Sequence, residues 1–139
     1  MINQFQTLLT FENIYLWANF GVLPFWLMLI FSPRSRITQI FVNSVIAPLI
    51  LAVAYVYVIY QSILLDVPIL NFFNLYLNLD SLYTIFAIES FLLVFWLHFL
   101  SLSLFLGSWV SRDAVKYTIS PTIVSICLVI IYFTGPLGL

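Results

Sequence analysis

The residue of this chain best suited to chemistry is its single histidine, His98, which lies in the uncharged stretch 90–111. If this stretch crosses a membrane, an ionisable side chain within it is costly and is a functional candidate by default. Its imidazole could transfer a proton or hold a polar group of a lipid-like substrate. The alternative is a structural histidine bonded to a neighbouring helix. We take His98 as the catalytic candidate.

Three other polar residues are candidates for contact with a bound molecule: Asn19, Ser101 and Asp113. Asn19 has an alternative role as a hydrogen-bonding link between helices. Asp113 has an alternative role as the partner of Arg112 in a solvated loop. Glu89 is interpreted as an interfacial charge, with a general acid in a pocket as the alternative.

Motifs of several common kinds of active site are missing from the sequence. It contains no glycine-rich phosphate loop, HExxH pair, nucleophile elbow or cluster of metal-ligating residues. Cys127 is the single cysteine, so it cannot form an internal disulfide. The net charge of −1 offers no basic surface for nucleic acid. We therefore predict no metal, no cofactor and no nucleic-acid partner.

The composition places the elements that carry these residues in a membrane. The 139 residues suffice for one domain, and 64% of them are hydrophobic while 6% are charged. An average soluble domain carries about 25% charged residues. Nine charged side chains cannot cover the surface of a soluble body of this size, so we predict a single integral membrane domain with membrane lipid as its surroundings.

Between the charged residues lie four long uncharged stretches: 13–33, 37–65, 90–111 and 117–139. Each reaches the roughly 20 residues that a helix needs to cross a bilayer. We therefore predict an all-α fold, an integral membrane four-helix bundle with helices at about 14–31, 38–64, 81–109 and 121–139.

All four basic residues fall in two of the predicted loops. Arg34 and Arg36 follow the first helix, and Arg112 and Lys116 follow the third. The positive-inside rule places both loops in the cytoplasm and both chain ends on the other side.

The segment between the second and third helices is polar on one face. Asn71, Asn74 and Asn78 recur at helical spacing, with apolar residues around them. The segment 67–79 is too short to span, so we predict a short interfacial helix there.

The last predicted helix is interrupted near its end. It can begin at Ser120-Pro121, but Gly135-Pro136 limits the regular helix to about Phe133. Irregular backbone at membrane depth must be buried in protein or line a cavity. We predict a pocket near residues 135–139.

Motifs in three regions, taken in order, give the chain a family resemblance. They are WANFGVLPFW at 17–26 followed by SPR at 32–34, then WLHFLSLSLFLGSW at 96–109 followed by RD at 112–113, and finally GPLGL at 135–139. Together they resemble the ABA-deficient-four-like membrane family over nearly the whole chain.

The resemblance implies a link to carotenoid chemistry, since plant members are associated with making neoxanthin from violaxanthin in plastid membranes. Opening an epoxide needs a proton donor and a base. Ser103 and Ser108 stand where the family pattern usually carries aspartate and arginine, so His98 and Asp113 are the matched ionisable groups. Trp26 lies in the first motif and Trp109 in the second, and both are aromatic candidates for ligand contact.

Three functions follow as hypotheses. The first is a multi-pass membrane protein that binds or isomerises an isoprenoid-like, carotenoid-like or other lipidic molecule. The second is a non-enzymatic membrane scaffold or complex subunit. The third is a small transporter, which would need to oligomerise. The expected location is a bacterial inner membrane or an organelle membrane, and a homo-oligomer is compatible with each hypothesis.

Overall fold

The computed structural model describes residues 9–42, 46–65 and 76–139, and within these ranges it is all-helical with no strand. The all-α prediction is therefore confirmed for the described residues. The elements in chain order are α2 (Phe11–Phe31), α3 (Arg36–Phe41), α4 (Ile46–Leu64), α6 (Leu79–Phe86), α7 (Glu89–Lys116), α8 (Pro121–Thr134) and the 3-10 turn η1 (Pro136–Gly138).

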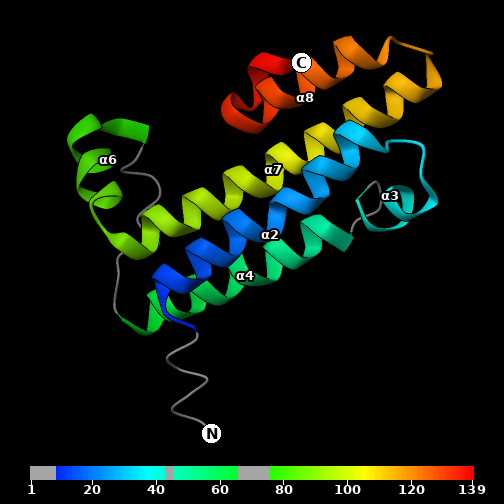
Figure 1. The fold of residues 1–139 in the computed structure, drawn as a ribbon. Helices are drawn as coiled ribbons and strands as arrows, with labels where there is room; N and C mark the ends of the chain where they lie inside the picture. Colours follow the sequence, from blue (N-terminus) through cyan, green and yellow to red (C-terminus); the bar gives the residue numbers. More distant parts are fainter. Residues whose placement is uncertain (1–8, 43–45, 66–75) are drawn as a thin grey trace, which may run out of the picture.

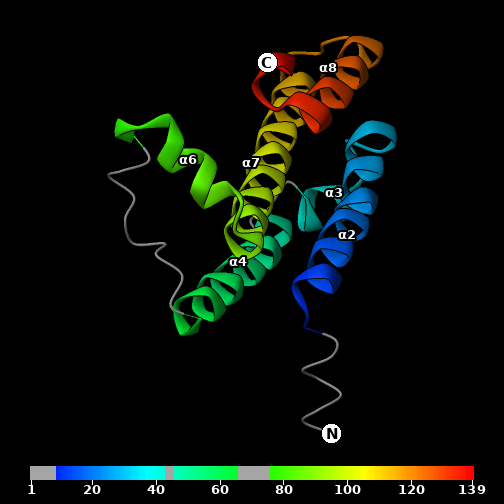
Figure 2. The ribbon, with the colours of Figure 1, turned by 90° about the vertical axis from the view of Figure 1, so that its left-hand side faces the viewer.

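The long helix α7 forms the centre of the structure. It packs against α2, α4 and α8, and α2, α4 and α7 lie side by side with α4 antiparallel to the other two (Figures 1 and 2). The helix α8 turns back along the C-terminal half of α7. The core consists of aliphatic residues from these helices, among which Leu29, Leu97, Leu104, Leu128 and Ile131 are fully buried.

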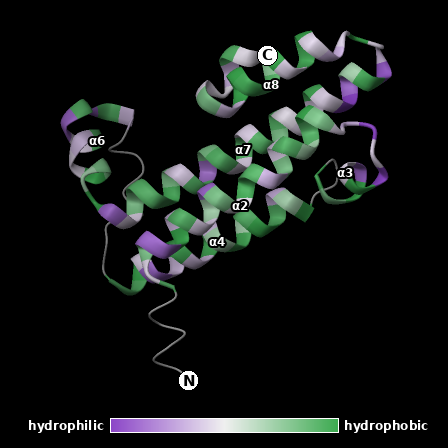
Figure 3. Ribbon diagram, in the orientation of Figure 1, coloured by the Kyte–Doolittle hydropathy of each residue, from purple (hydrophilic) through white to green (hydrophobic). Residues whose placement is uncertain are grey.

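Within the described residues, three segments are long and apolar enough to cross a membrane: α2, α3 taken together with α4, and α7. Their outer surfaces carry exposed large hydrophobic side chains such as Phe20, Phe31 and Val53. Figure 3 shows hydrophobic residues along these helices and hydrophilic residues gathered toward their ends. Lipid tails would cover such a surface without the cost that water imposes.

The first two predicted spans differ from the structure at their starts. The helix predicted at 14–31 begins earlier, at Phe11, because the Thr10 hydroxyl accepts a hydrogen bond from the Asn13 N–H at 3.3 Å and caps the helix. The helix predicted at 38–64 corresponds to α3 and α4, and residues 43–45 between them lie outside the described residues.

The prediction of one continuous helix over 81–109 is wrong, because the helix is interrupted within that range and extends beyond its predicted end. The structure places α6 before a break at Ala87 and Ile88, and α7 then continues to Lys116. Across this break Phe86 of α6 packs edge-to-face on Phe91 and Phe95 of α7, with ring centroids 5.3 and 5.0 Å apart. These aromatic contacts stabilise the bend. At the other end of α7, the positive charge of Lys116 in the last turn interacts favourably with the helix dipole.

Nine of the thirteen residues of the predicted interfacial helix over 67–79, namely 67–75, lie outside the described residues. Its last asparagine, Asn78, is described and caps α6, because its Oδ1 accepts a hydrogen bond from the Asp80 N–H at 3.0 Å.

The last predicted helix, 121–139, is shorter than a span. The helix α8 has 14 residues, which corresponds to about 21 Å at 1.5 Å per residue. The predicted limit near Phe133 is confirmed to within one residue. At Gly135, with φ 68°, the chain turns and η1 folds back onto α8. The described residues therefore give three membrane-length segments where four spans were expected.

Candidate functional site

The catalytic candidate His98 lies on an exposed face of α7, next to α4. Its ring is 6.0 Å from that of Tyr55, measured between centroids, with 43° between the two planes. Asp113 lies fifteen residues further along the same helix, or about 22 Å. The structure therefore does not bring together the two ionisable groups that the sequence motifs matched.

Asn19 connects α2 to α7. Its Oδ1 accepts a hydrogen bond from Trp96 Nε1 at 3.1 Å, and its Nδ2 donates one to the Tyr15 carbonyl at 2.7 Å. The rings of Tyr15 and Trp96 also lie beside each other, 6.1 Å apart. Both polar atoms of the Asn19 side chain thus make hydrogen bonds within the protein. This agrees with the alternative role of Asn19 as a link between helices.

Trp26 is part of the core, at 3% exposure. Its ring packs edge-to-face on Tyr132 of α8, 5.4 Å between centroids. It also lies directly over Gly107 of α7, where a Cβ would come within 2.7 Å of the indole. Its Nε1 is buried and has no hydrogen-bond partner. Trp26 therefore fills the junction of α2, α7 and α8.

Trp109 and Asp113 are the two predicted site residues that share a cavity. This cavity of about 460 Å³ is also lined by Cys127, Gly138 and Leu139. Gly138 and Leu139 belong to the segment 135–139 near which a pocket was predicted, and η1 folds back onto α8 there. Ser101, on the same helix, is half-buried and does not line this cavity.

A second hollow, which the sequence reasoning missed, is an apolar groove of about 400 Å³ between α2 and α4. Small residues on both helices hold it open, among them Ala18, Gly21, Ala47 and Ala54, and aromatic rings line it at Trp17, Phe25 and Tyr57. A Cβ built on Gly21 would meet no atom within 4 Å. The small residues at i and i+3 on the first predicted helix could have indicated this groove.

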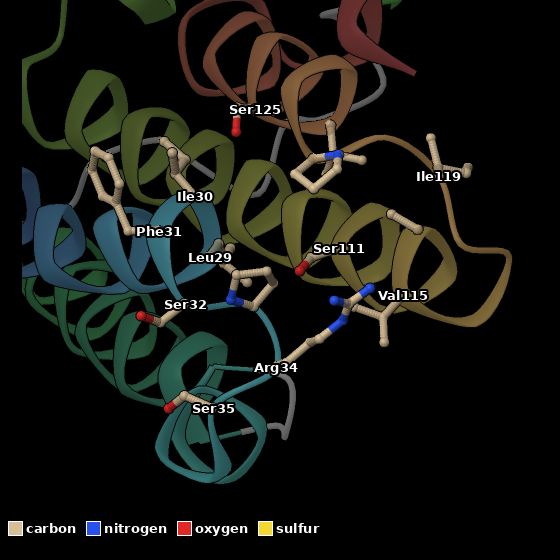
Figure 4. Close-up of a pocket in the computed structure, with 14 residues that line it drawn as sticks. Leu29, Ile30, Phe31, Ser32, Arg34, Ser35, Ser111, Val115, Ile119 and Ser125 are labelled. Atoms are coloured by element: carbon tan, nitrogen blue, oxygen red, sulfur yellow. The ribbon is translucent and has the colours of Figure 1, made fainter.

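A third cavity, also missed, lies at the end of the bundle that carries the basic residues. Its volume is about 380 Å³, and its walls come from the α2–α3 turn, the last turns of α7 and the start of α8. Figure 4 shows Arg34 and Ser111 among the side chains around it. The Ser-Pro-Arg-Ser run at 32–35, between two apolar stretches, was the feature of the sequence that could have marked it.

The described residues contain no group of three or more His, Cys, Asp or Glu side chains able to hold a metal ion. The hollows differ in the chemistry they offer: apolar contact in the groove between α2 and α4, and hydrogen bonding with a positive charge in the cavity beside Arg34. Carboxylates line others: Asp113 the cavity beside Trp109, and Glu12 with Glu89 a cavity of about 480 Å³ at the opposite end of α7.

The described part of this chain is helical, with three segments of membrane length and an apolar groove between two helices, and so has the features of a small helical membrane protein. This chain belongs to the ABA DEFICIENT 4-like family, whose family model matches residues 13–139. The resemblance seen in the three sequence motifs is thereby confirmed.

A curated relative agrees with this membership. The chain is 28% identical over 120 residues to "Protein ABA DEFICIENT 4, chloroplastic" from Arabidopsis thaliana, a match that covers 84% of this chain and 54% of that protein. The chain therefore spans about half the length of the curated relative it matches. No solved structure is significantly similar to this chain.

Proposed function

We propose that this chain is a membrane protein that binds a hydrophobic, isoprenoid-like molecule in the groove between α2 and α4. The observation that carries the proposal is the lining of the groove, which holds small and aromatic residues and no charged one. Such a surface offers few hydrogen-bonding groups, among them the Tyr57 hydroxyl, and so favours an apolar ligand.

The membrane setting narrows the class of ligand. Lipid tails are as apolar as the groove, so burial alone does not favour a ligand over lipid. A rigid polyene loses less conformational freedom on binding than a flexible acyl chain does. It can also stack on the rings of Trp17 and Phe25. A stiff isoprenoid, of which a carotenoid is one example, is therefore the favoured ligand.

The groove supports binding more directly than isomerisation. Tyr57 is its one ionisable lining residue, and the hydroxyl of Tyr57 accepts a hydrogen bond from Gln61 Nε2 at 3.1 Å. Proton transfer needs a catalytic group within hydrogen-bond reach of the substrate. His98 does not line the groove, although it contacts Tyr55 of the same helix wall.

The setting we propose is an organelle membrane, because the Arabidopsis relative is named as chloroplastic. The comparisons give no support to a bacterial inner membrane. Within that membrane we propose that α2, the α3–α4 segment and α7 span, with α8 embedded beside α7 as a shorter fourth helix. A homo-oligomer is compatible with this arrangement.

The test is ligand retention by the protein purified from membranes that contain a polyene. Gly21→Phe fills the groove, whereas Val56→Phe places the same ring on an exposed position of α4 that does not line it. Mass spectrometry and the absorption spectrum should show bound polyene in the parent protein and in Val56→Phe. We expect Gly21→Phe to retain several-fold less.

Two outcomes would contradict the proposal. One is equal retention in the two variants, which would place any bound molecule outside the groove. The other is a parent protein that carries no hydrophobic molecule and purifies with a stoichiometric protein partner. That result would favour the scaffold hypothesis.

A further inference from the structure

We propose that the cavity bounded by the α2–α3 turn, α7 and α8 is a binding site for a phosphate-type oxyanion, such as the headgroup of an anionic lipid. This inference does not depend on the proposed function, because the site lies at one end of the bundle and shares no lining residue with the α2–α4 groove. Three separate features of the cavity support it.

The first feature is a positive charge with no negative charge beside it. Arg34 lines the cavity, and none of the fourteen lining residues is acidic. Figure 4 shows the Arg34 side chain extending from the turn toward the end of α7 where Ser111 and Val115 lie. A planar guanidinium group can donate two parallel hydrogen bonds to a phosphate. The acidic residue of this region, Asp113, lines a different cavity.

The second feature is a buried hydroxyl without a partner. Ser111 is 0% exposed, and its Oγ makes no hydrogen bond. Serine within a helix commonly donates to the carbonyl four residues earlier. An unsatisfied buried hydroxyl costs roughly 1–3 kcal/mol, and an acceptor atom of a ligand at this cavity wall would remove that cost.

The third feature is the start of α8. Ser120 stands at the N-cap position but makes no side-chain capping bond, and Pro121 at the first turn lines the cavity. The first amides of a helix lack intrahelical acceptors and carry the positive end of the helix dipole. An anion in the cavity would interact favourably with that end.

The turn that carries Arg34 is held in place by its own hydrogen bonds. Thr38 Oγ1 donates to the Ser32 carbonyl at 2.7 Å, and the Thr38 N–H donates to Ser35 Oγ at 3.3 Å. A turn fixed in this way positions the Arg34 backbone before any ligand binds, which lowers the entropy cost of binding.

The remaining walls favour a lipid as the source of the phosphate. Leu29, Ile30, Phe31 and Val124 line the cavity on its apolar side. Acyl chains attached to a headgroup could lie against these residues. Arg36, Arg112 and Lys116 lie at the same end of the bundle, where they would attract an anionic membrane surface.

The experiment measures binding to the full chain in nanodiscs. One arm compares phosphatidylcholine alone with phosphatidylcholine containing phosphatidic acid, with bound lipid counted by native mass spectrometry. The other arm titrates inorganic phosphate. Arg34→Gln removes the charge at the cavity, and Arg36→Gln is the matched control, because Arg36 is exposed and does not line it. Ser111→Ala removes the orphaned hydroxyl.

We expect Arg34→Gln to weaken binding about tenfold, as fits the loss of charge-assisted hydrogen bonds, and Arg36→Gln to weaken it less than about threefold. Ser111→Ala should fold like the parent and bind several-fold more weakly. Saturable binding of phosphatidic acid alone would identify a lipid headgroup as the source. Equal binding of inorganic phosphate would identify the free anion. Equal losses in the two arginine variants, or binding in neither arm, would overturn the proposal.

Discussion

The indole of Trp96 donates a hydrogen bond from Nε1 to Asn19 Oδ1 at 3.1 Å and so joins α7 to α2. The same asparagine donates from Nδ2 to the carbonyl of Tyr15, one turn earlier on its own helix. Inside a membrane this side chain would otherwise lack partners, because lipid offers none. The hydrogen bond therefore fixes the rotation of α2 relative to α7. This rotation decides which face of α2 is turned toward α4 and lines the groove.

A double-mutant cycle should detect this link. We expect Asn19→Ala and Trp96→Phe each to destabilise the fold, and the pair to couple by about 0.6 kcal/mol, the average for interhelical hydrogen bonds in membranes. Unfolding in mixed micelles, followed by the circular dichroism of the helices, would give the four free energies of unfolding. Purely additive losses would show that the hydrogen bond contributes no stability of its own.

The contact of Trp26 with Gly107 predicts a site where one added methyl group is harmful. A Cβ on Gly107 would lie 2.7 Å from Cη2 and 2.8 Å from Cζ3 of the buried indole. Because that ring also packs on Tyr132, it cannot move away freely. We expect Gly107→Ala to lower the free energy of unfolding by about 1–3 kcal/mol.

Gly21→Ala is the matched control for this prediction. It lies within α2, where an added Cβ meets no atom within 4 Å. Alanine is favoured over glycine in helices, so we expect the variant to be as stable as the parent or more stable by up to about 1 kcal/mol. Thermal unfolding in detergent would compare the two. A similar loss at both positions would mean that the tight contact with Trp26 does not matter.

Much of the helical framework follows from the sequence because lipid leaves few choices. Uncharged stretches of membrane length must satisfy their backbone internally, which predicts helices. The end of α2 at Phe31 and the start of α8 at Pro121 follow from local capping and proline rules. The break at Ala87 and Ile88 contains neither glycine nor proline. It depends on the tertiary packing of Phe86, which local rules do not contain.

The candidate site was harder to predict than the helices. Polar side chains in an apolar sequence are the natural candidates for a site. In the structure, however, Asn19 is hydrogen-bonded within the bundle, and His98 lies beside Tyr55 on an exposed face. The groove between α2 and α4 depends on small residues that meet across two helices. The cavity beside Arg34 depends on the α2–α3 turn lying next to the end of α7, which is distant in sequence. Arg34 and Ser111, 77 positions apart, line one cavity because of how α2 and α7 pack, and neither residue indicates that cavity alone.

The turn between α2 and α3 should depend on the hydroxyl of Thr38. This residue is fully buried, and its Oγ1 donates to the Ser32 carbonyl at 2.7 Å. Thr38→Val keeps the shape but removes the donor, so we expect a loss of about 1–2 kcal/mol and faster amide hydrogen exchange across residues 32–38. Thr38→Ser keeps the hydroxyl and should preserve slow exchange there. Fast exchange in both variants would assign the effect to packing of the methyl group instead.

His98 offers a test that separates binding from chemistry. Its described contact is the ring of Tyr55, and it does not line the α2–α4 groove. We expect the free energy of unfolding of His98→Ala to lie within about 0.5 kcal/mol of the parent value, as is usual for surface substitutions. We also expect this variant to retain a bound polyene fully. His98→Gln, which keeps a polar side chain without an ionisable ring, is the control. Loss of occupancy in both variants would place the ligand against α7 rather than in the groove.

Chromatography of the extracted polyene tests the predicted proton transfer by His98 separately. If His98 catalyses isomerisation, both variants keep the ligand but no longer change its isomer distribution.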